Sequence, residues 1–132
     1  MKVLLDTNAY TALMSDRGNV VEKVRRSEGV LLSSIVLGEL LFGCRNGSRY
    51  EQNRAQLDAF MANRFVELAP VHLSTAEHFG LVAAQLRRRG TPIPSDDIWI
   101  AAHAMETGAE LISFDAHFAQ VEGLFWTQLS PN

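Results

Sequence analysis

The chain has 132 residues, of which 47% are hydrophobic and 20% are charged, a composition that is typical of one globular core and excludes a disordered or fibrous chain. Its formal net charge of −3 excludes a generic DNA-coating protein with a basic excess, but it leaves a nuclease open because acidic metal ligands lower the sum. No leader and no run of about 18 apolar residues is visible, and the one cysteine, Cys44, cannot form an internal disulfide, so we expect a cytoplasmic protein that does not span a membrane.

Short apolar runs alternate along the chain with longer segments of helical period. Val3-Leu4-Leu5 predicts a buried strand that ends at Asp6, and Thr7 or Asn8 is expected to cap a short helix after it. The remaining predicted elements, in chain order, are a helix at 19–27, a strand at 30–32, a helix from Ser33 or Ser34 to Cys44, a helix at 50–62, a strand at 65–68, helices at 74–89 and 96–106, a strand at 111–112, a helical turn at 116–120 and a strand at 124–125.

This regular alternation of strands and helices predicts an α/β fold. We expect a single domain over residues 1–132, built as an α/β/α sandwich around a parallel sheet of roughly five strands. Sheets of this kind place functional sites beyond the carboxyl ends of their strands.

Three aspartates fall at positions where such a site would form. Asp6 directly follows the first predicted strand, and Asp115 follows the strand at 111–112. Asp97 begins a helix after a loop with two prolines, where the helix dipole favours an anion. Each aspartate also has an ordinary interpretation, because Asp is common as a helix cap and in turns.

Glu39 is harder to interpret as an ordinary surface residue. The segment 35–44 contains one charged residue in ten positions, so we expect its helix to be largely buried. An ionised carboxylate in such a helix is costly unless it is paired or binds a metal. The alternatives are that Glu39 faces an exposed strip beside Gly38 and Gly43, or that it pairs with an arginine.

Carboxylates that converge at one end of a sheet repel one another, and a divalent cation relieves that repulsion. Oxygen ligands select hard ions such as Mg²⁺ or Mn²⁺. None of the four histidines has a cysteine or a second histidine at zinc-finger spacing. We therefore expect no zinc site, and we interpret the histidines as ordinary polar residues; they are His72, His78, His103 and His117.

Four motifs together carry a family resemblance. They are Leu-Asp-Thr-Asn at 5–8, Ser-x-x-x-x-Gly-Glu-Leu at 33–40, Pro-x-Asp-Asp-x-x-Ile-Ala-Ala-His-Ala at 94–104 and Leu-Ile-Ser-x-Asp-x-x-Phe at 111–118. Each motif alone is weak, but their order and spacing from Val3 to about Trp126 resemble the PIN-domain family. More narrowly, the chain resembles the VapC toxins of bacterial toxin–antitoxin pairs.

The resemblance implies a set of catalytic, metal-binding acids, which are Asp6, Glu39, Asp97 and Asp115. It gives supporting positions to Thr7, Asn8 and Ser113. Asp96 stands where relatives often have Asn, so it either assists the site or is easily mistaken for the ligand. Val36 stands where many relatives have Thr, which removes a supporting hydrogen bond but leaves the ligand set intact.

By the same resemblance, the activity is Mg²⁺- or Mn²⁺-dependent cleavage of RNA. A metal held by Asp6 and Asp97 would lower the pKa of a water and direct it at phosphorus, with Glu39 and Asp115 completing the site. RNA would be selected by shape and by exposed loop bases. Candidate phosphate contacts are Arg45, Arg49, Arg54, Arg87, Arg88 and Arg89, and Trp99 is either part of the core or a base-stacking residue. The implied partners are a small VapB-like antitoxin and a second copy of the chain.

Other functions remain as alternatives. A PIN-fold nuclease of RNA processing would have the same site without a toxin role, and a degenerate PIN domain would only bind. An aspartyl-phosphate phosphatase also uses a strand-terminal Asp as its nucleophile. Those enzymes, however, resemble a motif with a second Asp where this chain has Asn8, and they need a late lysine, whereas the only lysines are Lys2 and Lys23.

Overall fold

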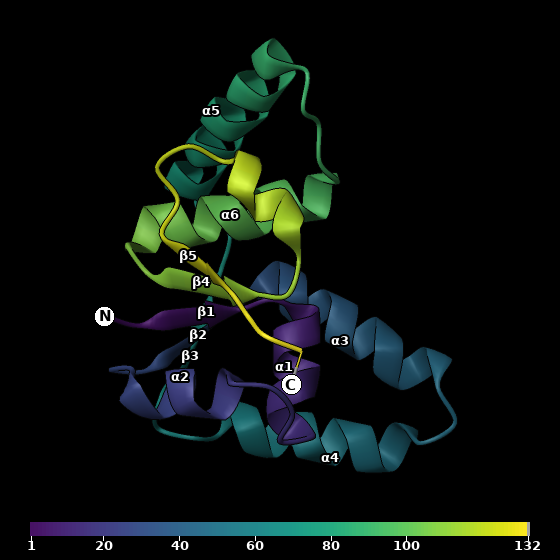
Figure 1. Cartoon of the computed structure of the whole chain (residues 1–132). Helices are drawn as coiled ribbons and strands as arrows, with labels where there is room; N and C mark the ends of the chain where they lie inside the picture. Colours follow the sequence, from purple (N-terminus) through teal and green to yellow (C-terminus); the bar gives the residue numbers. More distant parts are fainter. Residues whose placement is uncertain (132) are drawn as a thin grey trace.

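A five-stranded parallel sheet forms the centre of the computed structural model, which describes residues 1–131 (Figure 1). The strands are β1 (Val3–Leu5), β2 (Val30–Ser33), β3 (Val66–Ala69), β4 (Glu110–Ser113) and β5 (Trp126–Gln128). They lie in the order β3-β2-β1-β4-β5, and each neighbouring pair is parallel. The predicted α/β class with a parallel five-stranded sheet is confirmed.

Helices cover both faces of this sheet, as Figure 1 shows. One face carries α1 (Thr7–Met14), α2 (Val20–Arg26), α3 (Ser34–Asn46) and α4 (Tyr50–Met61), and the other carries α5 (Leu73–Arg89) and α6 (Ser95–Thr107). A short 3₁₀ helix, η1 (Ala116–Gln120), lies between β4 and β5. Within residues 1–131, no helix is long and apolar enough to cross a bilayer.

The order of the strands creates a crevice beside β1. From β1 the chain moves outward to β2 and β3, and it then returns to β4 on the other side of β1. At such a reversal the loops that follow the two central strands diverge to opposite faces, which opens a binding crevice beyond their carboxyl ends. The residues that follow β1 and β4 therefore line the same opening.

The core is mostly apolar, and its buried polar residues include one histidine. Leu4, Leu32 and Ile112 are fully buried in the sheet, as the strand predictions require. His103 on α6 is also fully buried, with its Nδ1 2.8 Å from Ser33 Oγ and its Nε2 3.2 Å from the Pro70 carbonyl oxygen. Its two hydrogen bonds agree with the prediction that it is an ordinary, satisfied polar residue.

Two predictions about elements are wrong. The last strand begins at Trp126 and not at Leu124, because the chain turns at Gly123 (φ +77°) and the next two residues only lead into the strand. The helix that contains Glu39 is not largely buried, since its buried residues are Val36 and Cys44 and its Phe42 is 69% exposed. Figure 1 shows the reason, because α3 extends away from the sheet toward its contact with α4.

Candidate functional site

Asp6 is held by the fold at both of its carboxylate oxygens. It follows β1 directly and caps α1, with its Oδ1 accepting a hydrogen bond of 2.9 Å from the backbone N–H of Ala9. Asp6 itself, and not Thr7 or Asn8 as predicted, is therefore the cap. Its Oδ2 accepts a short hydrogen bond from the hydroxyl of Ser113, the last residue of β4. Because β1 and β4 are neighbours, these contacts fix a carboxylate that is only 7% exposed.

Asp97 and Asp115 approach each other from different elements. Asp97 lies in the first turn of α6, and Asp115 caps η1 by accepting a hydrogen bond of 2.9 Å from the His117 N–H. The side chain of His117 joins them, with its Nδ1 3.1 Å from Asp115 Oδ1 and 4.0 Å from Asp97 Oδ2. One possible ligand atom of each residue lies within 4.8 Å of the others.

His117 was missed by the sequence analysis, which treated it as an ordinary polar residue. His117 is close to Asp97 because of the path of the chain after β4. A search for histidines and cysteines at zinc-finger spacing does not reveal such a contact. The available signal was its position two residues after Asp115 in a predicted helical turn, where a side chain folds back toward the cap.

Glu39 has contacts of its own, apart from those that join Asp97, Asp115 and His117. Its Oε1 accepts a hydrogen bond of 2.6 Å from Thr7 Oγ1 in the first turn of α1, and its carboxyl is hydrogen-bonded to that of Asp96. Glu39 is not a member of the group formed by Asp97, Asp115 and His117. Through Thr7, however, it is one residue removed from Asp6, so the four predicted acids surround the same end of the sheet in two subgroups.

Burial and nearby like charges raise the pKa of Asp6, Glu39 and Asp97. Burial, and then the charges of Asp96, Asp115 and Asp6, raise the pKa of Asp97 to about 6, against the opposing effect of His117. Burial also raises the pKa of Asp6, despite its hydrogen bonds from Ser113 and Ala9.

Glu39 also has a strongly raised pKa. Burial, and then the adjacent carboxyl of Asp96, raise the pKa of Glu39 to about 7, although the hydrogen bond from Thr7 acts in the opposite direction. Two adjacent carboxyls repel each other when both are ionised, which favours the protonated form of Glu39.

The donor atoms at this end of the sheet fit a hard divalent cation. Possible ligand atoms of Asp97, Asp115 and His117 lie within 4.8 Å of one another, and Asp6 is near enough for its charge to raise the pKa of Asp97. Oxygen-rich sets of this kind suit Mg²⁺ or Mn²⁺. A cation there would also remove the repulsion that raises the pKa of Asp97.

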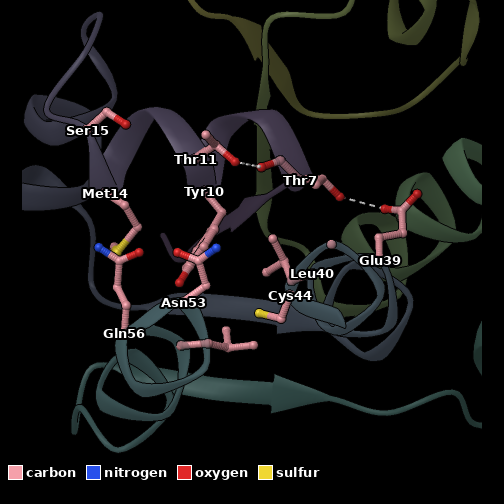
Figure 2. Close-up of a pocket in the computed structure, with 12 residues that line it drawn as sticks. Thr7, Tyr10, Thr11, Met14, Ser15, Glu39, Leu40, Cys44, Asn53 and Gln56 are labelled. Atoms are coloured by element: carbon pink, nitrogen blue, oxygen red, sulfur yellow. Dashed lines mark hydrogen bonds between the residues drawn. The ribbon is translucent and has the colours of Figure 1, made fainter. Parts of the chain in front are cut away.

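A groove of about 420 Å³ begins at Glu39 and runs between α1, α3 and α4 (Figure 2). Thr7 and Glu39, joined by their hydrogen bond, lie at one end of the residues drawn in Figure 2, and Ser15 and Met14 lie at the other. Tyr10, Leu40 and Leu57 add apolar surface to its walls.

Three of the six arginines predicted to bind phosphate have other contacts. The guanidinium of Arg45 lies 5.1 Å from the centre of the Tyr50 ring, and Arg54 donates hydrogen bonds to Asp58 and to the Tyr50 hydroxyl. At the end of α5, Arg89 donates to the carbonyl oxygen of Gln120 and pairs with a glutamate at 3.5 Å. Their role in binding phosphate stays a prediction.

Trp99 lies between two helices. Its ring centre is 4.2 Å from that of Phe79 on α5, and the indole is half-buried. This packing favours the interpretation of Trp99 as part of the core.

Comparisons with known proteins match this chain along nearly its whole length. A family model of the PIN domain matches residues 3–124. Ribonuclease VapC1 of Haemophilus influenzae strain R2866 is 30% identical over 131 residues, which cover 96% of each chain. The tRNA(fMet)-specific endonuclease VapC of Shigella flexneri is 28% identical over 127 residues, which cover 94% of this chain and 95% of that protein.

Solved structures of VapBC complexes also resemble this chain in fold. The structure of VapBC-1 from nontypeable Haemophilus influenzae matches with a TM-score of 0.85 at 28% identity, over 97% of this chain and 98% of that one. DNA-bound VapBC from Salmonella typhimurium matches with the same TM-score at 27% identity. The resemblance predicted from four motifs is thus confirmed in sequence and in fold, and the chain belongs to the PIN-domain family, among its VapC-type members.

Proposed function

We propose that the chain is a Mg²⁺- or Mn²⁺-dependent endoribonuclease that acts in the cytoplasm as the toxin of a toxin–antitoxin pair. The whole chain, residues 1–132, would form one nuclease domain. The observation that carries the proposal is the convergence of Asp6, Asp97 and Asp115 at the carboxyl ends of β1 and β4, in a chain whose relatives are named as ribonucleases.

Asp6, Asp97 and Asp115 would hold the cation, with Glu39 completing the acidic centre. When bound, a divalent cation lowers the pKa of a water and neutralises charge on phosphate oxygens. Ser113 orients Asp6 through its hydroxyl, and His117 orients Asp115 through its Nδ1.

Glu39 has the properties of a group that moves a proton. Its Oε1 is fixed by Thr7, and its pKa of about 7 leaves the carboxyl divided between its two protonation states near neutral pH. A group with such a pKa both accepts and donates protons efficiently at neutral pH. Glu39 would therefore accept a proton during water attack, while Asp96 keeps its pKa high.

The substrate class is RNA with exposed, single-stranded bases. Water attack on phosphorus does not use the 2′-hydroxyl, so the acidic centre by itself does not reject DNA. Discrimination would come from the shape of a loop and from contacts with splayed bases, as is usual for proteins that recognise RNA.

A small VapB-like antitoxin is the partner that we propose for the groove of Figure 2. Structures of VapBC complexes match this chain closely, and the groove joins apolar walls to the carboxylate of Glu39. A peptide with apolar side chains and one Arg or Lys would fill the groove and pair with the acids. We also propose a homodimer, by analogy with the family.

Cleavage of RNA in vitro tests the nuclease proposal. The purified protein should cut a mixed tRNA pool in Mn²⁺, and EDTA or Asp97→Asn should abolish the cutting. Asp58→Asn is a matched control, because Asp58 is an exposed acid on α4 that pairs with Arg54. Cutting that persists in Asp97→Asn, or in EDTA, would overturn the proposed mechanism.

Co-expression separates a toxin from a nuclease of RNA processing. Expression of the protein alone should stop growth, and the product of a small neighbouring reading frame should restore it. Growth unaffected by the intact protein, with no neighbouring product that binds it, would remove the toxin role and leave the nuclease proposal standing.

A further inference from the structure

A second depression has a volume of about 250 Å³. It is lined by Asn8, Thr11, Arg17, Phe114 and Pro131. Thr11 also lines the groove of Figure 2, so the two hollows adjoin along α1. Asn8 is two residues after Asp6, and Phe114 directly precedes Asp115, so two residues that line this depression are close in sequence to two of the acids.

Arg17 brings a positive charge to this depression, and no acid within residues 1–131 pairs with it. Its side chain is exposed, and it makes no hydrogen bond or ion pair with any side chain in the described part of the chain. By contrast, Arg25 and Arg26 both pair with Glu22. An unpaired guanidinium beside an acidic centre is available to an anionic group of a ligand.

The backbone holds Arg17 at this place. The flanking residues Asp16 and Gly18 adopt left-handed conformations, with φ +53° and +68°, and the N–H of Arg17 donates a hydrogen bond of 2.9 Å to the Ala12 carbonyl oxygen. The C-terminal segment closes the loop, because the N–H of Ser130 donates to Asn19 Oδ1 at 3.1 Å. Arg17 thus lies in a turn that these backbone and side-chain hydrogen bonds hold in place.

Gly18 also joins Arg17 to the aromatic wall. A Cβ at Gly18 would lie 3.5 Å from Cζ of Phe114 and 2.6 Å from the Ser130 carbonyl oxygen, so the ring packs closely against this turn. Phe114 remains partly exposed toward the depression. A guanidinium and an aromatic ring therefore flank the same hollow.

We propose that Asn8, Arg17 and Phe114 form a subsite for one nucleotide of single-stranded RNA beside the acidic centre. This inference rests on the proposed nuclease function. Arg17 pairs with a phosphate that is not cut, Phe114 stacks on the base, and the Asn8 amide binds a base edge or a ribose hydroxyl. Aromatic rings and arginines are the usual means by which proteins hold unpaired nucleotides. The positive charge also offsets the repulsion between RNA and a protein of net charge −3.

Binding of a fluorescein-labelled single-stranded RNA by anisotropy tests the subsite. The measurement uses protein with Asp97→Asn, which keeps the RNA intact, in Mn²⁺ over a range of salt concentrations. Adding Arg17→Ala should weaken binding about tenfold, as expected for one charged contact. It should also reduce the magnitude of the negative slope of log affinity against log salt by about 0.7, the value for one phosphate on a single strand. Arg17→Lys should keep the slope.

Arg64→Ala is the matched control. Arg64 is an exposed arginine near Gly29 and Phe65, which precede β2 and β3, so it lies at the opposite end of the strands. Its loss removes the same charge and should leave the salt slope unchanged. Phe114→Leu should weaken binding and Phe114→Tyr should preserve it, because tyrosine keeps a stacking face. The melting temperature of Arg17→Ala should match that of the parent, which excludes a folding defect.

The possible results separate this inference from the proposed function. If the unsubstituted protein cuts RNA but Arg17→Ala and Phe114→Leu bind RNA as tightly as the parent, the subsite is wrong and the nuclease stands. If Arg17→Ala weakens only the binding of an antitoxin, the depression is a protein contact and the subsite is again wrong. A protein that neither binds nor cuts RNA overturns the proposed function itself.

Discussion

The ionised form of Asp97 is disfavoured in the metal-free protein, because the residue is partly buried and lies near other carboxylates. Its pKa is raised to about 6 in the fold, against 3.8 in an unfolded chain, so the folded state binds more protons than the unfolded state between these values. The free energy of unfolding therefore falls as pH rises from about 4 to about 6, and the loss is complete above that range. The ionised carboxylate that would bind a cation is therefore also the form of Asp97 that lowers the stability of the fold.

Asp97→Asn should accordingly stabilise the metal-free protein at neutral pH. Since a shift of one unit corresponds to about 1.4 kcal/mol, we expect a gain of about 1–3 kcal/mol at pH 7.5 and almost none at pH 4. Urea unfolding in EDTA at both values measures it. Asp58→Asn, on the exposed face of α4, should show no such gain, and a neutral-pH destabilisation by Asp97→Asn would contradict the argument.

Asp96 and Asp97 should have different roles although they are neighbours. Asp96 contacts Glu39 and raises its pKa, whereas Asp97 faces Asp115 and His117. Asp96→Asn should retain cleavage and move the acid limb of the pH–rate profile to lower pH, because Glu39 loses a like charge. Asp97→Asn should abolish cleavage at every pH. Equal losses in both variants would refute this division.

Among the elements, α6 connects the core to the site. It carries Asp97 in its first turn, and its buried His103 ties it to Ser33 at the end of β2 and to Pro70 after β3. A displacement of His103 would be transmitted along the helix to Asp97. The neutral imidazole of the buried His103 therefore helps to position Asp97 by holding α6 in place.

The burial of His103 should make the protein sensitive to acid. Burial lowers the pKa of His103 below its ordinary value of 6.5, so below pH 6.5 the unfolded chain gains a proton that the folded protein does not. Stability from this residue falls as pH decreases below 6.5, opposite in sign to the effect of Asp97. His103→Gln should flatten that part of the dependence in thermal melts between pH 4.5 and 7. An unchanged slope would show that the imidazole is not the cause.

The elements also show what the sequence could and could not predict. The positions of Asp6 and Asp115 just beyond β1 and β4 could be predicted, because the carboxyl ends of parallel strands meet at one edge; their role as site residues stays a prediction. Glu39 was found by its charge in an apolar segment, but the burial of α3 was overestimated, because periodicity does not reveal that a helix leaves the sheet. His117 and Arg17 were not predicted, since the position of His117 beside the acids depends on a 3₁₀ helix and that of Arg17 in the depression depends on a left-handed turn.

For the molecule as a whole, a cation should increase stability as well as support cleavage. A ligand that binds only the folded state adds about 2.7 kcal/mol at a hundred times its dissociation constant. The melting temperature should rise with millimolar Mn²⁺, and the rise should be smaller in Asp97→Asn. Asp58→Asn should respond as the parent does. No rise in the parent would count against a metal centre.

The double anchoring of Asp6 decides how an inactive form of this protein is best made. One oxygen of Asp6 starts α1 and the other joins β1 to β4 through Ser113. An amide at this position keeps the first contact, since Asn is also a good helix cap, but its NH₂ group cannot accept the second. A substitution at Asp6 would therefore combine lost catalysis with a loosened sheet, and the two effects could not be told apart. For trapping intact RNA or an antitoxin on an otherwise native molecule, Asp97 is the better residue to change.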